Sequence, residues 1–475
     1  MVFSSFTFVC AFLPVIFVLY QIVPGLKAKN VLLIVGSLLF YAYGEPVYVL
    51  LILVSSLCNY LFARMIAGTK TEKSKKLFLA IAVILNLGAL GVFKYAGFAV
   101  NSVNAVTGLA LPVPQIALPI GISFFTFQAL SYVIDVYRGT VAVEKNYLNI
   151  LLYISFFPQL IAGPIVKFHD INAALRERNH TPALTVAGLR RFICGLGKKV
   201  LIANAMGQVA DTVFGLQTGQ INAPIAWLGA IAYMLQIYYD FSGYSDMAIG
   251  LGKMFGFVFR ENFNYPYTAD NIQDFWRRWH ISMSTWFKEY LYFPLGGNRK
   301  GKARTSVNKI IVFLCTGLWH GANWTFVLWG AYHGFFLLLE SYVPAVKKLP
   351  KALGKIYSLL VVCVGFVLFR ADNLGQFGHM VAGMFAGFTF TDETTACLMR
   401  MLTPWFLLML VAAVIGAGFI KKPVAFLRQK TEEAVAAGQV NAYSAALSCA
   451  SLLLLVWCIL RLSGQGYNPF IYFRF

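Results

Sequence analysis

The stretch Leu77-Phe-Leu-Ala-Ile-Ala-Val-Ile-Leu-Asn-Leu-Gly-Ala-Leu-Gly-Val-Phe93 contains no charged residue. A bilayer core about 30 Å thick needs about 20 apolar residues in a helix, and this run approaches that length. Helices and closed barrels are the only structures that satisfy their backbone hydrogen bonds in lipid, and a run this long is typical of a helix. The stretch therefore predicts a membrane-spanning helix.

Similar apolar runs continue along the chain on both sides of this stretch. They are Phe6–Val23, Val31–Tyr43, Val47–Phe62, Ile225–Ala248, Ile356–Phe369, Trp405–Ile420 and Tyr443–Leu460. The 475-residue chain is 59% hydrophobic and 12% charged, whereas soluble domains carry about 25% charged residues. We therefore expect an all-α, polytopic transmembrane fold in a single domain over residues 1–475, with about ten to twelve crossings.

The first run, Phe6–Val23, resembles the core of a signal peptide in length. It lacks a basic segment before it and a small-residue cleavage site after it, so we predict a permanent helix. The eight cysteines are scattered and none forms a C-x-x-C pair. Neither a zinc site nor a disulfide framework is expected from that spacing.

Basic loops alternate with loops that carry no charge. Arg64–Lys76 is rich in lysine, whereas Phe98–Ile120 and Phe214–Met234 contain no charged residue. The positive-inside rule then places the Arg64–Lys76 loop in the cytoplasm and the N-terminus outside. The net charge of +20 comes from basic residues that lie beside the apolar runs, so the charge indicates a membrane protein and not a nucleic-acid partner.

Two regions depart from a simple series of crossings. Leu148–Ile165 has basic residues on both flanks and contains Pro158 and Pro164, so we expect a re-entrant or interfacial segment. The helix that follows is expected to present a basic cytoplasmic face, formed by Arg190, Arg191, Lys198 and Lys199.

The motif Gly317-Leu-Trp-His-Gly-Ala-Asn-Trp324 places a histidine deep in an apolar run. His320 follows Lys309, at the expected cytoplasmic edge, by eleven residues, which is about 16 Å of helix. The triplet Gly321-Ala-Asn323 predicts a helix break, and irregular backbone in a membrane is tolerated where it is buried in protein or lines a cavity. Two interpretations remain open: a functional site, or a buried histidine bonded to a carbonyl.

A second histidine lies in Asn271-Ile-Gln-Asp-Phe-Trp-Arg-Arg-Trp-His-Ile-Ser282. If the segment is one helix, His280 shares a face with Trp276 and Met283. The segment is then either an interfacial anchor or a donor site, in which Arg277 and Arg278 gather an anionic, phosphorylated donor. His333 either lines the same cavity as His320 or is a polar residue satisfied between helices. The remaining histidines, His169, His180 and His379, are interpreted as ordinary or loop residues.

A third polar island, Asp240-Phe-Ser-Gly-Tyr-Ser-Asp246, interrupts an apolar run. Its two carboxylates either orient a histidine or an acceptor hydroxyl, or form structural hydrogen bonds with neighbouring helices.

Taken together, these motifs resemble the membrane-bound O-acyltransferase family, and within it the bacterial alginate O-acetylation subgroup. The resemblance rests on Tyr239–Gly250, Asn264-Tyr-Pro-Tyr267, Phe275–Ser282, Tyr290–Asn298, Leu318–Trp324 and the segment Asn468-Pro-Phe-Ile-Tyr-Phe-Arg-Phe475. It implies helices around a central tunnel, with a motif-bearing core over about residues 239–334. It also implies that His280 and His320 are the two signature positions and that His320 is the essential one.

The resemblance further implies the reaction and its setting. The expected donor is cytoplasmic acetyl-CoA, and the acceptor is a polysaccharide hydroxyl outside the cell. A periplasmic partner of the Ser-Gly-Asn-His hydrolase type is expected. The chain itself is expected in the bacterial inner membrane, and the charge of its loops places the N-terminus in the periplasm. Neither a bound cofactor nor a metal is required.

A neutral imidazole suits the removal of a proton from a hydroxyl that attacks a thioester. His320 is therefore the expected general base, and His280 is expected to hold the donor carbonyl or the leaving thiolate. Trp319 and Asn323 are expected to shape the pocket. The competing hypotheses are D-alanyl transfer to teichoic acid, a transporter or flippase with a broken helix, and a scaffold that recruits the periplasmic enzyme.

Overall fold

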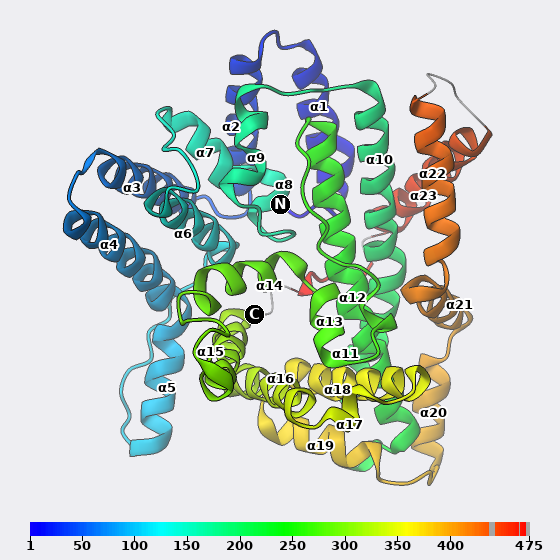
Figure 1. Ribbon diagram of the computed structural model, residues 1–475. Coiled ribbons are helices and arrows are strands. Elements are labelled where there is room, and N and C mark those ends of the chain that lie inside the picture. The colour runs from blue at the N-terminus through cyan, green and yellow to red at the C-terminus, as the bar shows by residue number, and fades with distance from the viewer. Residues whose placement is uncertain (437–441, 465, 472–475) are drawn as a thin grey trace. The chain divides into compact units, whose positions relative to one another are not determined.

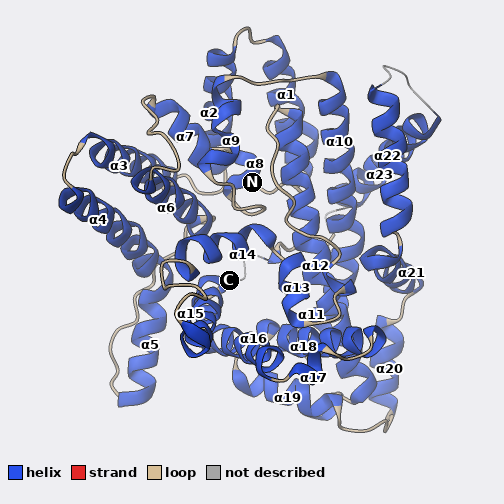
Figure 2. Ribbon diagram, viewed as in Figure 1, coloured by secondary structure: helices blue, strands red, loops and turns tan. Residues whose placement is uncertain are grey.

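The computed structural model describes residues 1–436, 442–464 and 466–471, and in these residues every regular element is a helix (Figure 1, Figure 2). The predicted all-α fold is therefore confirmed. The chain forms two compact units, Met1–Phe192 with Met247–Arg260, and Ile193–Asp246 with Glu261–Phe475. The single domain over residues 1–475 stays a prediction.

The first unit contains the N-terminal helices. They are η1 (Phe8–Phe12), α1 (Leu13–Ile22), α2 (Leu26–Ala42), α3 (Val49–Gly68), α4 (Glu72–Leu90), η2 (Gly91–Tyr95), α5 (Ala96–Thr107), α6 (Ile122–Arg138), α7 (Tyr147–Ser155), α8 (Phe157–Leu160), α9 (Phe168–Arg176) and most of α10 (Pro182–Gly197). In this unit α3, α4 and α6 pack against one another (Figure 1).

Among the described residues, four helical segments are long and apolar enough to cross a membrane: Val49–Gly68, Glu72–Thr107, Lys351–Arg370 and Ala442–Ser463. The bent pair Asp392–Met401 and Pro404–Gly418 adds a fifth if it counts as one crossing. Large apolar side chains on these helices remain exposed, such as Val54 at 58% and Ile84 at 67%. An exposed apolar face of this kind suits contact with lipid. The chain is thus a multi-pass membrane protein, while ten to twelve crossings stays a prediction.

The segment Leu148–Ile165 is not one continuous helix. Helix α7 ends at Ser155, the short helix α8 follows Phe156, and the backbone is irregular from Ile161 to Val166. Side chains from Ile150 to Ile165 are buried in the first unit. The predicted interruption is confirmed, and its position relative to the bilayer stays a prediction.

The second unit contains the helices that carry the motifs. They are η3 (Lys198–Ala203), α11 (Asn204–Phe214), η4 (Thr218–Gln220), α12 (Ala223–Met254, up to Asp246), η5 (Pro266–Thr268), α13 (Ile272–Arg278), α14 (Ile281–Phe287), η6 (Lys288–Tyr292), α15 (Gly301–His320), α16 (Trp324–Tyr342), α17 (Pro344–Lys347), α18 (Lys351–Arg370), α19 (Leu374–Met384), α20 (Asp392–Met401), α21 (Pro404–Val414), η7 (Ile415–Phe419), α22 (Lys421–Ala436) and α23 (Ala442–Ser463).

Helices α15 and α16 form an antiparallel hairpin with His320 at its turn. The hydroxyls of Ser306 and Tyr342 form a hydrogen bond at the end of the hairpin away from the turn. Near the turn, Gly317 and Gly330 allow the two backbones to approach closely. A Cβ on Gly317 would lie 2.2 Å from the carbonyl oxygen of Phe326, so only glycine permits this approach. The predicted break after His320 is confirmed, but the chain reverses there instead of continuing as one interrupted crossing.

The segment from Asn271 to Phe287 is not one helix, and the prediction of a shared face for Trp276 and His280 was wrong. Helix α13 ends at Arg278, and α14 starts at Ile281. Between them His280 has a φ of 44° and a ψ of 56°, a left-handed conformation that stops helix propagation. His280 therefore lies at a turn between two short helices.

Candidate active site around His320 and His280

His320 is the last residue of α15, and its ring is oriented by its own helix. Nδ1 lies 2.8 Å from the carbonyl oxygen of Thr316. A carbonyl only accepts, so Nδ1 must carry the proton, and in the neutral ring the lone pair is then on Nε2. The arrangement fixes the tautomer that a general base needs.

Aromatic side chains surround the His320 ring. The ring centroids of Trp319 and Trp329 each lie 5.0 Å from it, and that of Phe369 lies 5.2 Å away. The His320 side chain is 7% exposed. A cavity of about 10 Å³ adjoins it, lined by Ile237, Phe241, Trp279, His320, Trp329, Phe366, Phe369 and Ile471. That volume matches about one water molecule.

His280 is fully buried, and Asn262 holds its ring. His280 Nδ1 lies 3.2 Å from Asn262 Oδ1, which also accepts from the backbone N–H of Ser282 at 3.2 Å. Because that N–H is a donor, the atom it contacts must be the amide oxygen, and His280 Nδ1 must donate to it. Nε2 of His280 has no partner among the residues described here.

Burial also sets the charge of His280, which lies outside the four long apolar helices. Desolvation, followed by the nearby His320, lowers the pKa of the His280 imidazole well below its usual value, because a cation is disfavoured away from water. The neutral ring with Nδ1 protonated accepts at Nε2. Donation to a carbonyl or a thiolate would need a second proton on this ring.

Trp319 connects the two histidines. Its ring lies 5.0 Å from that of His320 and 5.9 Å from that of His280. The structure therefore brings together His320, His280 and Trp319, three of the residues singled out in the sequence. His333 is also close, at 5.0 Å from Trp329, and is buried among aromatic rings.

Asn323 has a structural part in the hairpin turn. Its Oδ1 accepts from the Thr325 N–H at 3.1 Å and so caps α16, and its Nδ2 donates to the Asp372 carbonyl at 2.9 Å. This residue fixes the turn that follows His320.

The lysines predicted to form a basic cytoplasmic face are instead paired with acidic residues of α12. Lys198 lies 2.7 Å from Asp246, and Lys199 lies 2.7 Å from Asp240 with both side chains at most 3% exposed. The prediction was therefore wrong for Lys198 and Lys199, because η3 packs with its lysines toward the carboxylates of α12.

The two arginines before His280 differ in their ion pairing and in their exposure. Arg278 Nε lies 2.7 Å from Asp274 one helical turn earlier, a pairing that the i, i+4 spacing permits. Arg277 is exposed. Of the two, Arg277 has the more accessible guanidinium.

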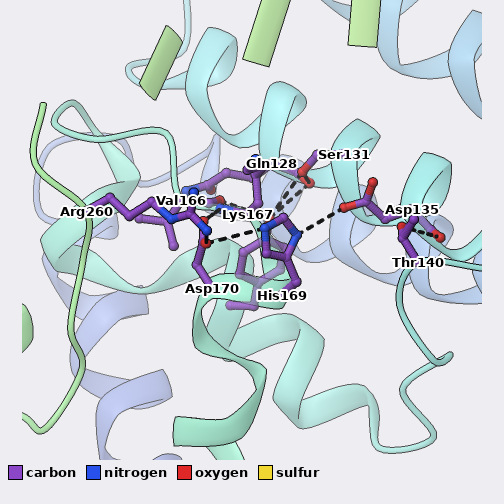
Figure 3. A network of polar contacts seen from close by, with 10 residues as sticks. Gln128, Ser131, Asp135, Thr140, Val166, Lys167, His169, Asp170 and Arg260 are labelled. Atoms are coloured by element: carbon purple, nitrogen blue, oxygen red, sulfur yellow. Dashed lines mark hydrogen bonds and ion pairs between the residues drawn. The ribbon is translucent and has the colours of Figure 1, made fainter. Parts of the chain in front are cut away.

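A separate polar network lies in the first unit (Figure 3). His169 lies 3.5 Å from Asp135 and 3.4 Å from Asp170, and Arg260 pairs with Asp170 at 2.7 Å. The backbone N–H of Lys167 also donates to Asp170, at 3.3 Å. His169, interpreted as an ordinary loop residue, is thus a link between two buried carboxylates.

Several residues of the site were not found by sequence reasoning. Asn262 is distant in the chain from the histidine it orients, and the lining residues Phe241, Phe369 and Ile471 come from separate helices and from the end of the chain. No periodic pattern marks them. The part of the chain that the structure describes contains no group of three or more histidine, cysteine or acidic side chains placed to hold a metal ion.

The sequence profile of the membrane-bound O-acyltransferase family matches residues 141–369. The chain is 41% identical to a probable alginate O-acetylase of Azotobacter vinelandii over the full length of both chains. It is 38% identical to the peptidoglycan O-acetyltransferase of Helicobacter pylori, over 81% of this chain and 80% of that one. It is 28% identical to the teichoic acid D-alanyltransferase of Bacillus subtilis, over 53% of this chain and 68% of that one.

The matched region contains both histidines and their supporting residues, from Asn262 to Phe369. The full-length similarity extends this match to the rest of the helices. The chain belongs to the membrane-bound O-acyltransferase family, and it is an O-acyltransferase.

Proposed function

We propose that this protein moves an acetyl group from a cytoplasmic donor, acetyl-CoA, across the inner membrane for O-acetylation of an exopolysaccharide such as alginate. The full-length similarity to a probable alginate O-acetylase supports this substrate class. The observation that carries the proposal is the His320 ring, whose Nδ1–H donates to the Thr316 carbonyl and whose lone pair is thereby on Nε2.

The proposed reaction needs one base and one leaving group. Nε2 of His320 takes the proton of the acceptor hydroxyl as its oxygen attacks the thioester carbonyl carbon. The carbon–sulfur bond then breaks, the acetyl ester forms, and the proton passes from His320 to the thiolate. His320 therefore holds the extra proton only between these two steps of the proposed reaction.

His280 is proposed to orient the donor. Since its Nδ1–H is taken by Asn262, its Nε2 suits a hydrogen bond from an N–H of the donor's pantetheine arm better than contact with a thiolate. Trp319, which contacts both imidazoles, is proposed to shape the pocket between donor and acceptor. Asn323 supports the same pocket from the hairpin turn.

The charged residues of the motifs are proposed to act at the edges of the site. The exposed Arg277 suits the phosphates of the donor, and Arg278 supports α13 through Asp274. Asp246 and Asp240 each form an ion pair with a lysine. We therefore propose that they support substrate binding through the residues they hold and do not contact the substrate.

The setting of the reaction is also a proposal. The basic Arg64–Lys76 loop favours a cytoplasmic position, and so a periplasmic N-terminus. A periplasmic partner of the Ser-Gly-Asn-His hydrolase type would carry the acetyl group to the polysaccharide.

The proposal is tested with acetyl-labelled CoA in membranes of a polysaccharide-producing host that expresses the chain. We expect label in a polysaccharide ester that mild alkali releases. D-alanyl transfer, favoured by the similarity to the D-alanyltransferase, predicts label from D-alanine and none from acetyl-CoA. Transport or flipping without a covalent acyl product would favour a transporter and contradict the proposal.

A further inference from the structure

The segment Tyr467–Ile471 of the second unit is held by polar side chains from separate helices. The ammonium of Lys199 donates to the carbonyl oxygen of Pro469, and Asn204 Nδ2 donates to Asn468 Oδ1 at 3.1 Å. These contacts fix the middle of a segment that has no helix or strand of its own except at its last described residue.

Both ends of the segment are fixed as well. The hydroxyl of Tyr467 donates to the carboxylate of Asp211, which pairs with Arg370 at 2.6 Å. At the other end, the backbone N–H of Ile471 donates to Asp240 Oδ2 at 2.8 Å.

Asp240 and Lys199 form the centre of these contacts. Asp240 Oδ1 lies 2.7 Å from Lys199 Nζ, and the two side chains are 1% and 3% exposed. The free-energy cost of removing two charges from water offsets most of their mutual attraction. A buried ion pair therefore adds little to the stability of the fold. Each of these two charges, however, also contacts the Tyr467–Ile471 backbone.

That backbone leads directly to the candidate active site. Ile471 is 5% exposed and lines the cavity beside His320, together with Phe241 and Phe369. Phe241 is the next residue after Asp240 on α12. The same helical turn therefore provides Asp240, which holds the segment Tyr467–Ile471, and Phe241, which lines the same cavity as Ile471.

We propose that the Lys199–Asp240 pair is a positioning element, which holds Tyr467–Ile471 as one wall of the His320 cavity. The pair touches no reacting atom. It sets where the acceptor hydroxyl can lie relative to Nε2 of His320, and a misplacement of about 1 Å in such a site can cost about 100-fold in rate. This inference rests on the proposed role of His320.

A double substitution separates positioning from stability. Lys199→Met or Asp240→Leu alone leaves a buried charge unpaired, and each is expected to accumulate poorly. The combined Lys199→Met/Asp240→Leu variant removes both charges with apolar side chains of similar size, so it is expected to accumulate and to unfold in detergent near the parent temperature. Because the contacts to Pro469 and Ile471 stay absent, its transfer should not recover.

Acetyl transfer from labelled acetyl-CoA is measured in membranes that contain equal amounts of protein. In the double variant we expect kcat about 100-fold below the parent, with KM for acetyl-CoA within about threefold, because the proposed role of the wall is to place the acceptor hydroxyl, while the donor is assigned to His280. A double variant with parental kcat would overturn the proposal.

Labelling of Ile471→Cys reports the position of the wall directly. The substitution is made after the eight native cysteines are replaced. A thiol reagent should modify Cys at this position slowly in the parent background and at least about tenfold faster with Lys199→Met/Asp240→Leu. Equal, slow labelling in both backgrounds would show that the pair does not hold the segment.

Further variants keep the test decisive. If the double variant fails to accumulate, Ile471→Pro removes the N–H that donates to Asp240 and should lower kcat in the same way. Ile471→Val keeps that N–H and an apolar side chain at the cavity, and should stay near the parent. Parental kcat in Ile471→Pro would overturn the proposal. The matched control Arg176→Met/Glu144→Gln neutralises an ion pair of the first unit and should keep parental transfer.

The labelling rate at Ile471→Cys does not depend on acetyl transfer, so it is also measured with His320→Ala. A failure of the proposed base changes transfer alone, whereas a failure of the positioning element changes the labelling result.

Discussion

At the scale of single residues, the backbone of His280 is as informative as its side chain. His280 and Tyr265 are the non-glycine residues with positive φ among those described. Such conformations cost about 1–3 kcal/mol and persist where the surroundings enforce them, often at functional sites. Asn262 and the packing of Phe241 at 4.6 Å enforce this one.

Two substitutions of His280 separate backbone strain from chemistry. Asparagine adopts positive φ more readily than alanine, so His280→Asn should unfold a few degrees above His280→Ala in detergent. Both variants should lose most acetyl transfer, because neither places an imidazole Nε2 beside the donor. Full transfer by His280→Asn would mean that the position matters only for the turn.

The orienting residue Asn262 gives a second prediction at this scale. Asn262→Ala removes the acceptor for both His280 and Ser282 and leaves buried donors unpaired, at a cost of about 1–3 kcal/mol. We expect transfer to fall about tenfold or more, measured with labelled acetyl-CoA in membranes. Asn262→Asp, which keeps an acceptor, should retain more activity than Asn262→Ala; the opposite order would exclude the orienting role.

At the scale of elements, the α15–α16 hairpin depends on glycines at its contact. Gly317→Ala would place a Cβ 2.2 Å from the Phe326 carbonyl oxygen, and must push the hairpin open. Overpacking of this kind costs about 1–3 kcal/mol, and the shift reaches His320 one turn away. We expect a lower unfolding temperature and reduced transfer.

The control for the hairpin is Gly378→Ala in α19, where an added Cβ meets nothing within 4 Å. Alanine is the better helix former by up to about 1 kcal/mol, so this variant should be as stable as the parent or more so. Equal behaviour of Gly317→Ala and Gly378→Ala would contradict the close approach of α15 and α16.

The network of Figure 3 predicts where α9 is most sensitive. Asp170 is bonded to the Lys167 N–H and lies beside His169 and Arg260. Asp170→Ala removes the cap and both charge contacts, and should lower the stability of the protein by about 1–2 kcal/mol. Thermal unfolding in detergent measures this, and an unchanged midpoint would show that the network adds nothing to stability.

At the scale of the whole molecule, the orientation in the membrane can be tested by labelling. Lys73 lies in the basic segment Arg64–Lys76, at the start of α4, and Gln115 lies in the uncharged segment Phe98–Ile120; both residues are exposed. On a cysteine-free background, a membrane-impermeant thiol reagent applied to intact spheroplasts should modify Gln115→Cys and leave Lys73→Cys unmodified. The reverse result would invert the orientation.

The sequence predicted the helical class and the histidines because those features are local. Apolar runs and a glycine-rich turn after His320 leave a pattern in neighbouring residues. The left-handed turn at His280 depends on contacts with Asn262, so the local pattern favoured one continuous helix there. The break after His320 was predicted, but the reversal of the chain at Gly321 depends on the close packing of α15 and α16.

The burial of Lys199 was missed for a related reason. Lys199 follows two arginines in the sequence, a pattern typical of a cytoplasmic anchor. Its partner Asp240 lies 41 residues further along the chain. The segment Asn468–Phe475 was recognised only by resemblance, and residues 472–475 lie outside the described residues. The contacts of Tyr467–Ile471 with Asp240 and the His320 cavity had no counterpart in any local pattern.

The His320→Ala variant decides whether His320 is the general base. Acetyl transfer from labelled acetyl-CoA is measured in membranes that contain matched amounts of the parent, His320→Ala and the control His379→Ala, whose histidine lies on α19. A general base contributes about 100-fold to 10,000-fold in rate, so His320→Ala should lose at least about 100-fold while His379→Ala stays near the parent. Transfer by His320→Ala within about threefold of the parent would contradict the proposed base.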